Sequence, residues 1–190
     1  VLGVFGSVVH VLHHLKVPYT FISPIGTGIF GDFVKEAIQK IGIKSEIRSE
    51  QANGCCYCFI EQNGERSFLS DHGAEYTFQS EWLNSLDLSS YAYIYLCGIE
   101  VEEKDGQEMI DALKHVTGKI VFCPSPRGKH IPKERLEQLY RYRPILHLND
   151  VEALELTKMQ TLEEALYALH EKTHELVVVT CGAKGVYYIL

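Results

Sequence analysis

Residues 119–152, KIVFCPSPRGKHIPKERLEQLYRYRPILHLNDVE, decide the fold because they place two strand signals on either side of a helix signal. The runs KIVFCP (119–124) and RPILHLN (143–149) are rich in branched apolar residues, and IPKERLEQLYRY (131–142) has its leucines at helical spacing. Strands that are apolar throughout and alternate with helices are typical of a parallel sheet covered by helices.

The same alternation continues on both sides of this stretch. YAYIYLC (91–97) and ELVVVTC (175–181) are predicted strands, and VEEKDGQEMIDALKHV (101–116) and DVEALELTK (150–158) are predicted helices. TLEE (161–164) has the form of a capping box that opens a further helix. We therefore predict an α/β protein with a doubly wound, mainly parallel sheet and helices on both faces.

The first part of the chain shows a different order of predicted elements. SVVHVLHHLKV (7–17) is a predicted helix, YTFISPI (19–25) a strand, and GIFGDFVKEAIQKIGI (28–43) a helix that Gly42 is placed to end. GCCYCFIEQNGERSFLSD (54–71) then carries two extended runs around Asn-Gly, the strongest short hairpin signal. We interpret this hairpin, at about 45–78, as a small β lid projecting from a single domain that spans 1–190.

Composition narrows the class of protein. A net charge of −7 and a pI near 5.7 argue against a general nucleic-acid binder, which needs a basic surface. The longest apolar runs are too short to span a bilayer, so we expect no membrane segment. The six cysteines suggest no disulfide framework, and Cys97, Cys123 and Cys181 lie within apolar runs, which favours a reducing, cytoplasmic location.

Ligands of open α/β sheets bind beyond the carboxyl ends of the strands, which selects a few segments for chemistry. These segments are PIGTGIFG (24–31), LCGIE (96–100), CPSPRGK (123–129), LNDVE (148–152) and TCGAKG (180–185).

Two of these segments have both a functional and a purely structural interpretation. Asn149 and Glu152 lie one helical turn apart, so they could hold Mg²⁺ through its waters, or simply form the N-cap and first turn of a helix. Thr180, Gly182 and Gly185 could offer a hydroxyl and backbone N–H groups to a nucleotide, or could form a plain hairpin turn.

Three other features favour the structural interpretation from sequence alone. Arg127 could meet a phosphate, but an arginine in a Pro-Gly loop is more often a surface residue. Histidines at i, i+3 and i+4 lack a neighbouring carboxylate or thiol, so we do not expect a metal there: His10, His13 and His14. Three cysteines in one extended run lack a second spaced pair, so strand packing is favoured over zinc: Cys55, Cys56 and Cys58.

Taken in order, these segments resemble the ribokinase-like (PfkB) family of carbohydrate and nucleoside kinases. The turn that begins at Gly26 is similar to the family's Gly-x-Asp-x-x-Gly turn, with Gly28 where the family usually has Asp. CPSPRG fits the family's Asp-Pro-Asn-x-Arg segment at Pro124 and Arg127, with Cys123 in place of the Asp. LNDVE matches the Asn-x-x-Glu motif through Asn149 and Glu152.

The resemblance extends to both ends of the chain. LGVFGSVVHVL resembles the family's sugar-site segment, in which Gly3 aligns with the second Gly, while Leu2 replaces the first Gly and Ser7 replaces the Asn. SFLSDHGAE (67–75) resembles the exit from the family's lid, and VVVTCGAKGVYYI (177–189) resembles its nucleotide-side strand and turn.

The resemblance implies ATP-dependent phosphorylation of a hydroxyl on a sugar, polyol or nucleoside, with ATP and Mg²⁺ as cofactors. It implies substrate contacts from Gly3 and Ser7 and a water-mediated Mg²⁺ contact from Glu152. A homodimer through the lid is also implied. The nucleotide contacts that it implies come from Asn149, Thr180, Gly182 and Gly185, and a further phosphate contact from Arg127.

The family's general base lies in an Asp-x-x-Gly-Ala-Gly-Asp segment, which this sequence does not contain. No catalytic residue is therefore predicted, and we expect the chain to be the central portion of a kinase that lacks an initial strand and the GAGD region. Because Leu2, Ser7, Gly28 and Cys123 depart from the family pattern, a relative that binds a metabolite without phosphorylating it is the alternative.

Overall fold

The computed structural model describes residues 4–45, 47–64 and 66–190. The chain divides into two compact units, Val1–Thr77 and Phe78–Leu190, which are described separately below.

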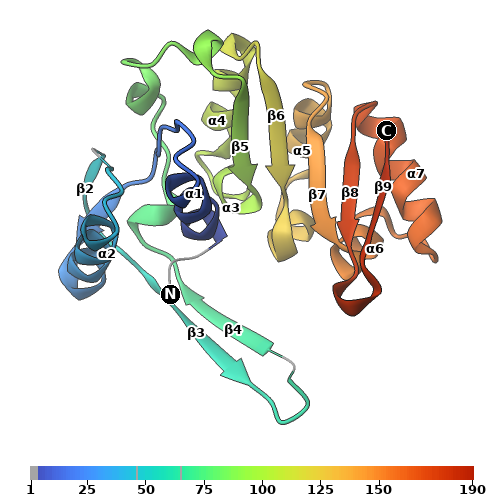
Figure 1. The fold of residues 1–190 in the computed structure, drawn as a ribbon, viewed down its shortest axis with the longest axis horizontal. Coiled ribbons are helices and arrows are strands. Elements are labelled where there is room, and N and C mark those ends of the chain that lie inside the picture. Colours follow the sequence, from blue (N-terminus) through green and yellow to red (C-terminus); the bar gives the residue numbers. More distant parts are fainter. Residues whose placement is uncertain (1–3, 46, 65) are drawn as a thin grey trace. The chain divides into compact units, whose positions relative to one another are not determined.

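The second unit is built on a five-stranded sheet (Figure 1). Its strands lie in chain order; the first four are parallel, and the last is antiparallel to its neighbour. The predicted strands of this region are thus confirmed. They are β5 (Tyr93–Cys97), β6 (Lys119–Cys123), β7 (Ile145–Asn149), β8 (Val177–Thr180) and β9 (Val186–Ile189).

Helices connect these strands, and one prediction about them is wrong in extent. The helix expected at 101–116 is broken at residues 103–105, because the Arg135 guanidinium donates to the carbonyls of Val101, Glu102 and Glu103 and so caps the first segment. The capping box at Thr161 and Glu164 is confirmed. The helices are α3 (Gly98–Glu102), α4 (Gly106–Ala112), α5 (Lys133–Tyr140), α6 (Asp150–Thr157) and α7 (Leu162–Thr173).

The core of this unit lies between the sheet and its helices. Alternate strand residues such as Phe122, Leu146 and Val179 are fully buried and pack with helix residues in one cluster. Residues of the opposite strand face are more open, and Tyr93 and Tyr188 are 63% and 67% exposed. The helices of this unit therefore pack on the face of the sheet that the buried cluster lines.

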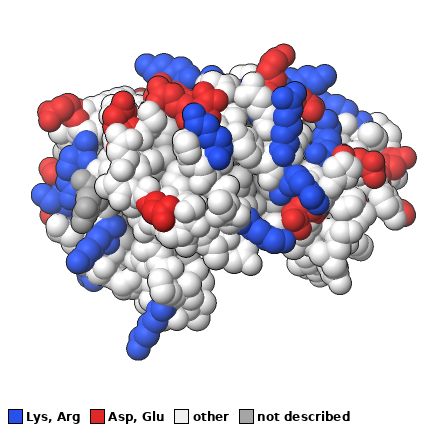
Figure 2. Space-filling view, turned by 90° about the horizontal axis from the view of Figure 1, so that it is seen from above, with Lys and Arg blue, Asp and Glu red and all other residues white. Residues whose placement is uncertain are grey.

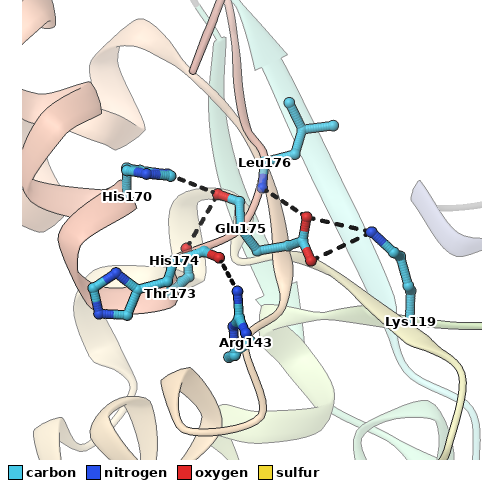
Figure 3. A network of polar contacts seen from close by, with 7 residues as sticks. All are labelled: Lys119, Arg143, His170, Thr173, His174, Glu175 and Leu176. Carbon is cyan, nitrogen blue, oxygen red and sulfur yellow. Dashed lines mark hydrogen bonds and ion pairs between the residues drawn. The ribbon is translucent and has the colours of Figure 1, made fainter. Parts of the chain in front are cut away.

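A polar network joins the amino ends of β6, β7 and β8 (Figure 3). Lys119 Nζ lies 3.3 Å from both carboxylate oxygens of Glu175, and the Leu176 N–H donates to the same carboxylate at 3.2 Å. These contacts lower the pKa of Glu175, the Leu176 N–H having the larger effect. Arg143 donates to the carbonyl of His174, which follows α7 in a left-handed conformation. The starts of β6, β7 and β8 are thereby joined.

The first unit contains two small sheets. The helix predicted at 28–43 is confirmed in substance, and Gly42, with φ +78°, lies just past its end. The strand predicted at 19–25 is wrong in extent: a ladder begins only at Ile25, after Pro24, which has no N–H to donate. The elements are α1 (Val4–His14), β1 (Ile25–Thr27), α2 (Gly28–Lys40), β2 (Arg48–Ala52), β3 (Cys55–Ile60) and β4 (Arg66–Asp71).

Strands β3 and β4 form the predicted hairpin, called the β3–β4 ribbon below (Figure 1). Cys55 pairs with Asp71 and Ile60 with Arg66, and Gly64 in the connecting turn has φ +88°. Both sides of the ribbon carry exposed apolar side chains, such as Tyr57 on one side and Phe68 on the other, at 57% and 60% exposure. An isolated two-stranded ribbon of this kind is only marginally stable, so its base must hold it in place.

On the face shown in Figure 2, basic and acidic side chains are intermixed rather than gathered into a basic area. Within the described residues, no helix combines the length and apolar character needed to cross a membrane.

Candidate active site

Asn149 and Glu152 form a capping box where β7 passes into α6. Asn149 Oδ1 accepts from the Glu152 N–H at 2.8 Å, and Glu152 Oε2 accepts from the Asn149 N–H at 3.0 Å. Asn149 therefore forms the N-cap of α6, and Glu152 completes its first turn. The cap does not exclude a metal role, because a carboxylate has two oxygens with about four acceptor sites, and the cap uses one of them.

The turn after β8 lies directly beside this cap. Thr180 is the register partner of Asn149 on the neighbouring strand, and its Oγ1 donates to the Leu148 carbonyl at 3.5 Å. Gly182 and Gly185 have φ of +55° and +95°, and apart from their chain neighbours no described residue has an atom within 4 Å of where a Cβ would sit on either one. The structure thus brings together the predicted nucleotide-binding residues Asn149, Thr180, Gly182 and Gly185 at one edge of the sheet.

The loops after β5 and β6 are in direct contact at the same edge. A Cβ on Gly98 would lie 2.0 Å from the Pro124 carbonyl oxygen, so the two backbones touch there. Ser125 has φ +55° and precedes Pro126, a conformation that stores strain in a non-glycine residue. A loop held in a costly conformation between two packed segments is a feature that functional sites often show.

Arg127, the candidate phosphate ligand, forms a two-pronged ion pair with Glu102 of α3. Their side chains are 32% and 14% exposed, so the pair is partly removed from water. The pair ties the loop after β6 to α3. A phosphate at this position would therefore compete with Glu102 for the guanidinium.

Cys123 occupies the place where the resembling family has Asp. Its Sγ lies 3.5 Å from His147 Nδ1 on the adjacent strand. Burial raises the pKa of Cys123, and also that of Cys97, its register partner on β5. Both are neutral thiols at physiological pH, so this position supplies no negative charge to the site.

Glu100 caps α3 by accepting from the Cys97 N–H at 2.7 Å. Burial raises the pKa of Glu100 to about 7, outweighing the opposing effect of its hydrogen bonds. The Glu100 carboxyl group thus binds its proton more tightly in the folded chain than in the unfolded chain. The contribution of Glu100 to the free energy of unfolding should be largest below the unfolded pKa near 4.5 and should fall as pH rises toward 7.

We expect Glu100→Gln, which keeps an acceptor for the Cys97 N–H, to remove this pH dependence. Urea midpoints at pH 5 and pH 8 measure it: the wild type should lose stability over this interval, and the variant should lose less. Equal losses in the two proteins would contradict the assignment to Glu100.

The predicted substrate residues lie in the first unit. Ser7 is an exposed residue of α1, and Gly3 lies outside the described residues. On the same helix, the His10 and His14 rings lie 4.6 Å apart, and His13 Nδ1 lies 2.9 Å from the Tyr19 hydroxyl.

Sequence reasoning selected the segment LCGIE but assigned none of its residues a role. In the structure Gly98 packs against the loop after β6 and Glu100 caps the start of α3, while Glu102, two residues beyond this segment, pairs with Arg127. The Cys-x-x-Glu spacing was a usable signal for the cap, because it has the form of a capping box with a thiol in place of the hydroxyl. No sequence signal indicated the Glu102 ion pair, which joins residues 25 apart.

Known proteins resemble this chain in sequence and in fold. Residues 3–190 match the pfkB family carbohydrate kinases. The uncharacterized sugar kinase YegV of Escherichia coli (strain K12) is 28% identical over 173 residues, which are 87% of this chain and 53% of that protein. The chain therefore spans about half the length of this curated relative.

Two solved structures have closely similar folds. A ribokinase from Thermotoga maritima superposes with a TM-score of 0.76 at 23% identity, over 95% of this chain and 60% of that one. A fructokinase with bound ATP from Xylella fastidiosa gives a TM-score of 0.77 at 18% identity, over 96% and 63%. The predicted α/β class, with a mainly parallel sheet and a small antiparallel ribbon, is confirmed. The chain belongs to the pfkB family of carbohydrate kinases, and its fold is ribokinase-like.

Proposed function

We propose that the complete protein transfers the γ-phosphate of ATP to a hydroxyl of a sugar, polyol or nucleoside. The observation that carries the proposal is the family match over residues 3–190, combined with the pairing of Asn149 and Thr180 at the carboxyl ends of β7 and β8. The Xylella fructokinase, with the same fold, holds ATP, and YegV is named a sugar kinase, which supports both halves of the reaction.

Phosphoryl transfer requires mainly that two reactants be positioned and phosphate charge be neutralised. ATP would supply the phosphoryl group, and Mg²⁺ would neutralise its charge. The backbone of Gly182 and Gly185 leaves room for the nucleotide beside Thr180, whose hydroxyl donates to the Leu148 carbonyl and can still accept a hydrogen bond from the nucleotide. Glu152, whose cap uses one acceptor site, can still accept from a water bound to Mg²⁺, a cation that usually keeps several waters.

Arg127 is proposed as a phosphate contact, with Glu102 holding the guanidinium until the phosphate arrives. Glu102 would then keep Arg127 ordered in the absence of ligand. A guanidinium suits both partners because its planar fork matches carboxylate and phosphate alike.

Gly3 and Ser7 are proposed to contact the acceptor, and the Ser7 hydroxyl can both donate to and accept from a polyol. The exposed apolar side chains of the β3–β4 ribbon support a homodimer that buries them. All six cysteines described are free thiols, which agrees with the proposed cytoplasmic location.

The alternative function is a metabolite-binding relative without kinase activity. This alternative is favoured by the neutral Cys123 thiol, which stands where the family's Asp-Pro-Asn-x-Arg segment has a carboxylate. The segment therefore lacks one negative charge in this chain. An active enzyme would need to manage without that charge.

The test uses the complete protein encoded by the gene, with ATP, Mg²⁺ and a panel of sugars, inositols and nucleosides. We expect ADP formation that depends on one acceptor class and stops when EDTA removes the metal. Binding of an acceptor by calorimetry without any ADP formation would favour the binding protein and defeat the kinase.

A further inference from the structure

One carboxylate holds both strands of the β3–β4 ribbon at their base. Gly54 precedes β3, and its N–H donates to Glu75 at 3.2 Å (Oε1) and 3.0 Å (Oε2). Gly73 follows β4, and its N–H donates to Glu75 Oε1 at 3.1 Å. Hydrogen bonds to a charged acceptor are stronger than neutral ones, so this contact is well suited to fix the ribbon where it leaves the unit.

Asn53 links this carboxylate to strand β1. Its Nδ2 donates to Glu75 Oε2 at 2.7 Å, and its Oδ1 accepts from the Gly26 N–H at 2.7 Å. Asn53 is only 6% exposed, so these hydrogen bonds are shielded from competing water. Gly26 lies in PIGTGIFG, one of the segments at the carboxyl end of a strand.

The backbones around the network are in contact, which leaves little freedom for one segment to move alone. A Cβ on Gly54 would lie 1.9 Å from the Asp71 carbonyl oxygen, and one on Gly73 would lie 2.1 Å from the Gly54 nitrogen. A Cβ on Gly26 would lie 2.2 Å from the Gln51 carbonyl oxygen. Because the ribbon's large apolar side chains are exposed, this base rather than side-chain packing sets its orientation.

We propose that Asn53 and Glu75 are positioning residues that make the ribbon and strand β1 move as one body. The proposal rests on the kinase function above, together with the interpretation of the ribbon as a lid over a hydroxylated acceptor. Closure of the ribbon then displaces Gly26 of β1 as well, so that acceptor binding alters both the ribbon and β1.

Residue-by-residue amide exchange, followed by NMR on the 190-residue chain, tests the coupling without any need for activity. In Glu75→Ala we expect the amides of β3 and β4 to exchange about tenfold faster or more. The decisive amide is that of Gly26. Its acceptor Asn53 remains in the variant, yet its exchange should also accelerate because Asn53 has lost its partner.

The reverse variant and two controls complete the design. Asn53→Ala should accelerate exchange in the ribbon although Glu75 is retained. Glu50→Gln, an exposed carboxylate on β2, should change neither region. Amides of β5 to β8 report on the second unit and should be unchanged in every variant. Unchanged exchange at Gly26 in Glu75→Ala, or in the ribbon in Asn53→Ala, would overturn the coupling.

Kinetics of the complete protein give the readout that a purely structural role would not produce. Glu75→Gln removes the charge but keeps one acceptor oxygen, and we expect KM for the acceptor to rise about tenfold with a smaller change in kcat. Equal losses in kcat and kcat/KM would contradict a positioning role. If no acceptor is phosphorylated at all, the proposed function fails, while the exchange experiment still decides the coupling.

Discussion

Gly98→Ala is expected to lower the free energy of unfolding of the 78–190 unit by about 3 kcal/mol. The added Cβ would lie 2.0 Å from the Pro124 carbonyl oxygen and 3.1 Å from the Arg127 Cβ. The nearest atom belongs to the backbone, so no flexible side chain can move aside. The loops after β5 and β6 must separate, and this also disturbs the ion pair between Glu102 and Arg127.

Chemical denaturation of the variant and the wild type measures this loss. Gly182→Ala is the matched control in the same unit: apart from its chain neighbours, no described residue lies within 4 Å of its added Cβ, and only its positive φ opposes the change, at about 1 kcal/mol. A loss no greater in Gly98→Ala than in Gly182→Ala would show that the two loops can part at little cost.

Glu152→Gln in the complete protein is expected to lower phosphoryl transfer by about a hundredfold or more. The glutamine amide oxygen can still accept from the Asn149 N–H, so the cap and the stability of α6 should be retained. What is lost is the negative charge of the Glu152 carboxylate, which in the proposed function accepts a hydrogen bond from a Mg²⁺-bound water. When rates are measured over a range of Mg²⁺ concentrations, the variant should need a higher Mg²⁺ concentration for half-maximal rate. Its rate should recover in part at high Mg²⁺.

The chain provides its own control for this variant. Glu164 forms the same capping box with Thr161 at the start of α7, a helix that does not follow a strand directly. Glu164→Gln makes the same chemical change in the same local structure and should leave the rate unchanged. If both variants lose stability and rate in parallel, Glu152 acts only as a cap.

Much of the second unit could be predicted because its sequence signals are local. Branched apolar runs such as the one ending at Cys123 specify buried strands, and Thr161 with Glu164 specifies a helix start within four residues. The Asn-Gly hairpin was equally local. These signals agree with one another, which is why the fold class followed from them.

One error arose because a distant residue decides the local structure. Arg135 ends α3 from a position more than thirty residues away, and no periodicity in 101–116 records that contact. The roles of Asn149 and Glu152 were ambiguous because one spacing serves both a cap and a ligand pair, and the structure shows that the cap at least is formed. The link between Asn53 and Glu75 joins residues 22 apart through side chains that each look ordinary in a loop.

The Lys119–Glu175–Leu176 network holds the strands together at one end of the sheet, and the loops of the candidate site lie at the other end. The segments after β7 and β8 can then shift around a ligand without unfastening the strands that carry them. Ligand binding should therefore reshape this rim of the sheet while the amino ends of its strands keep their places.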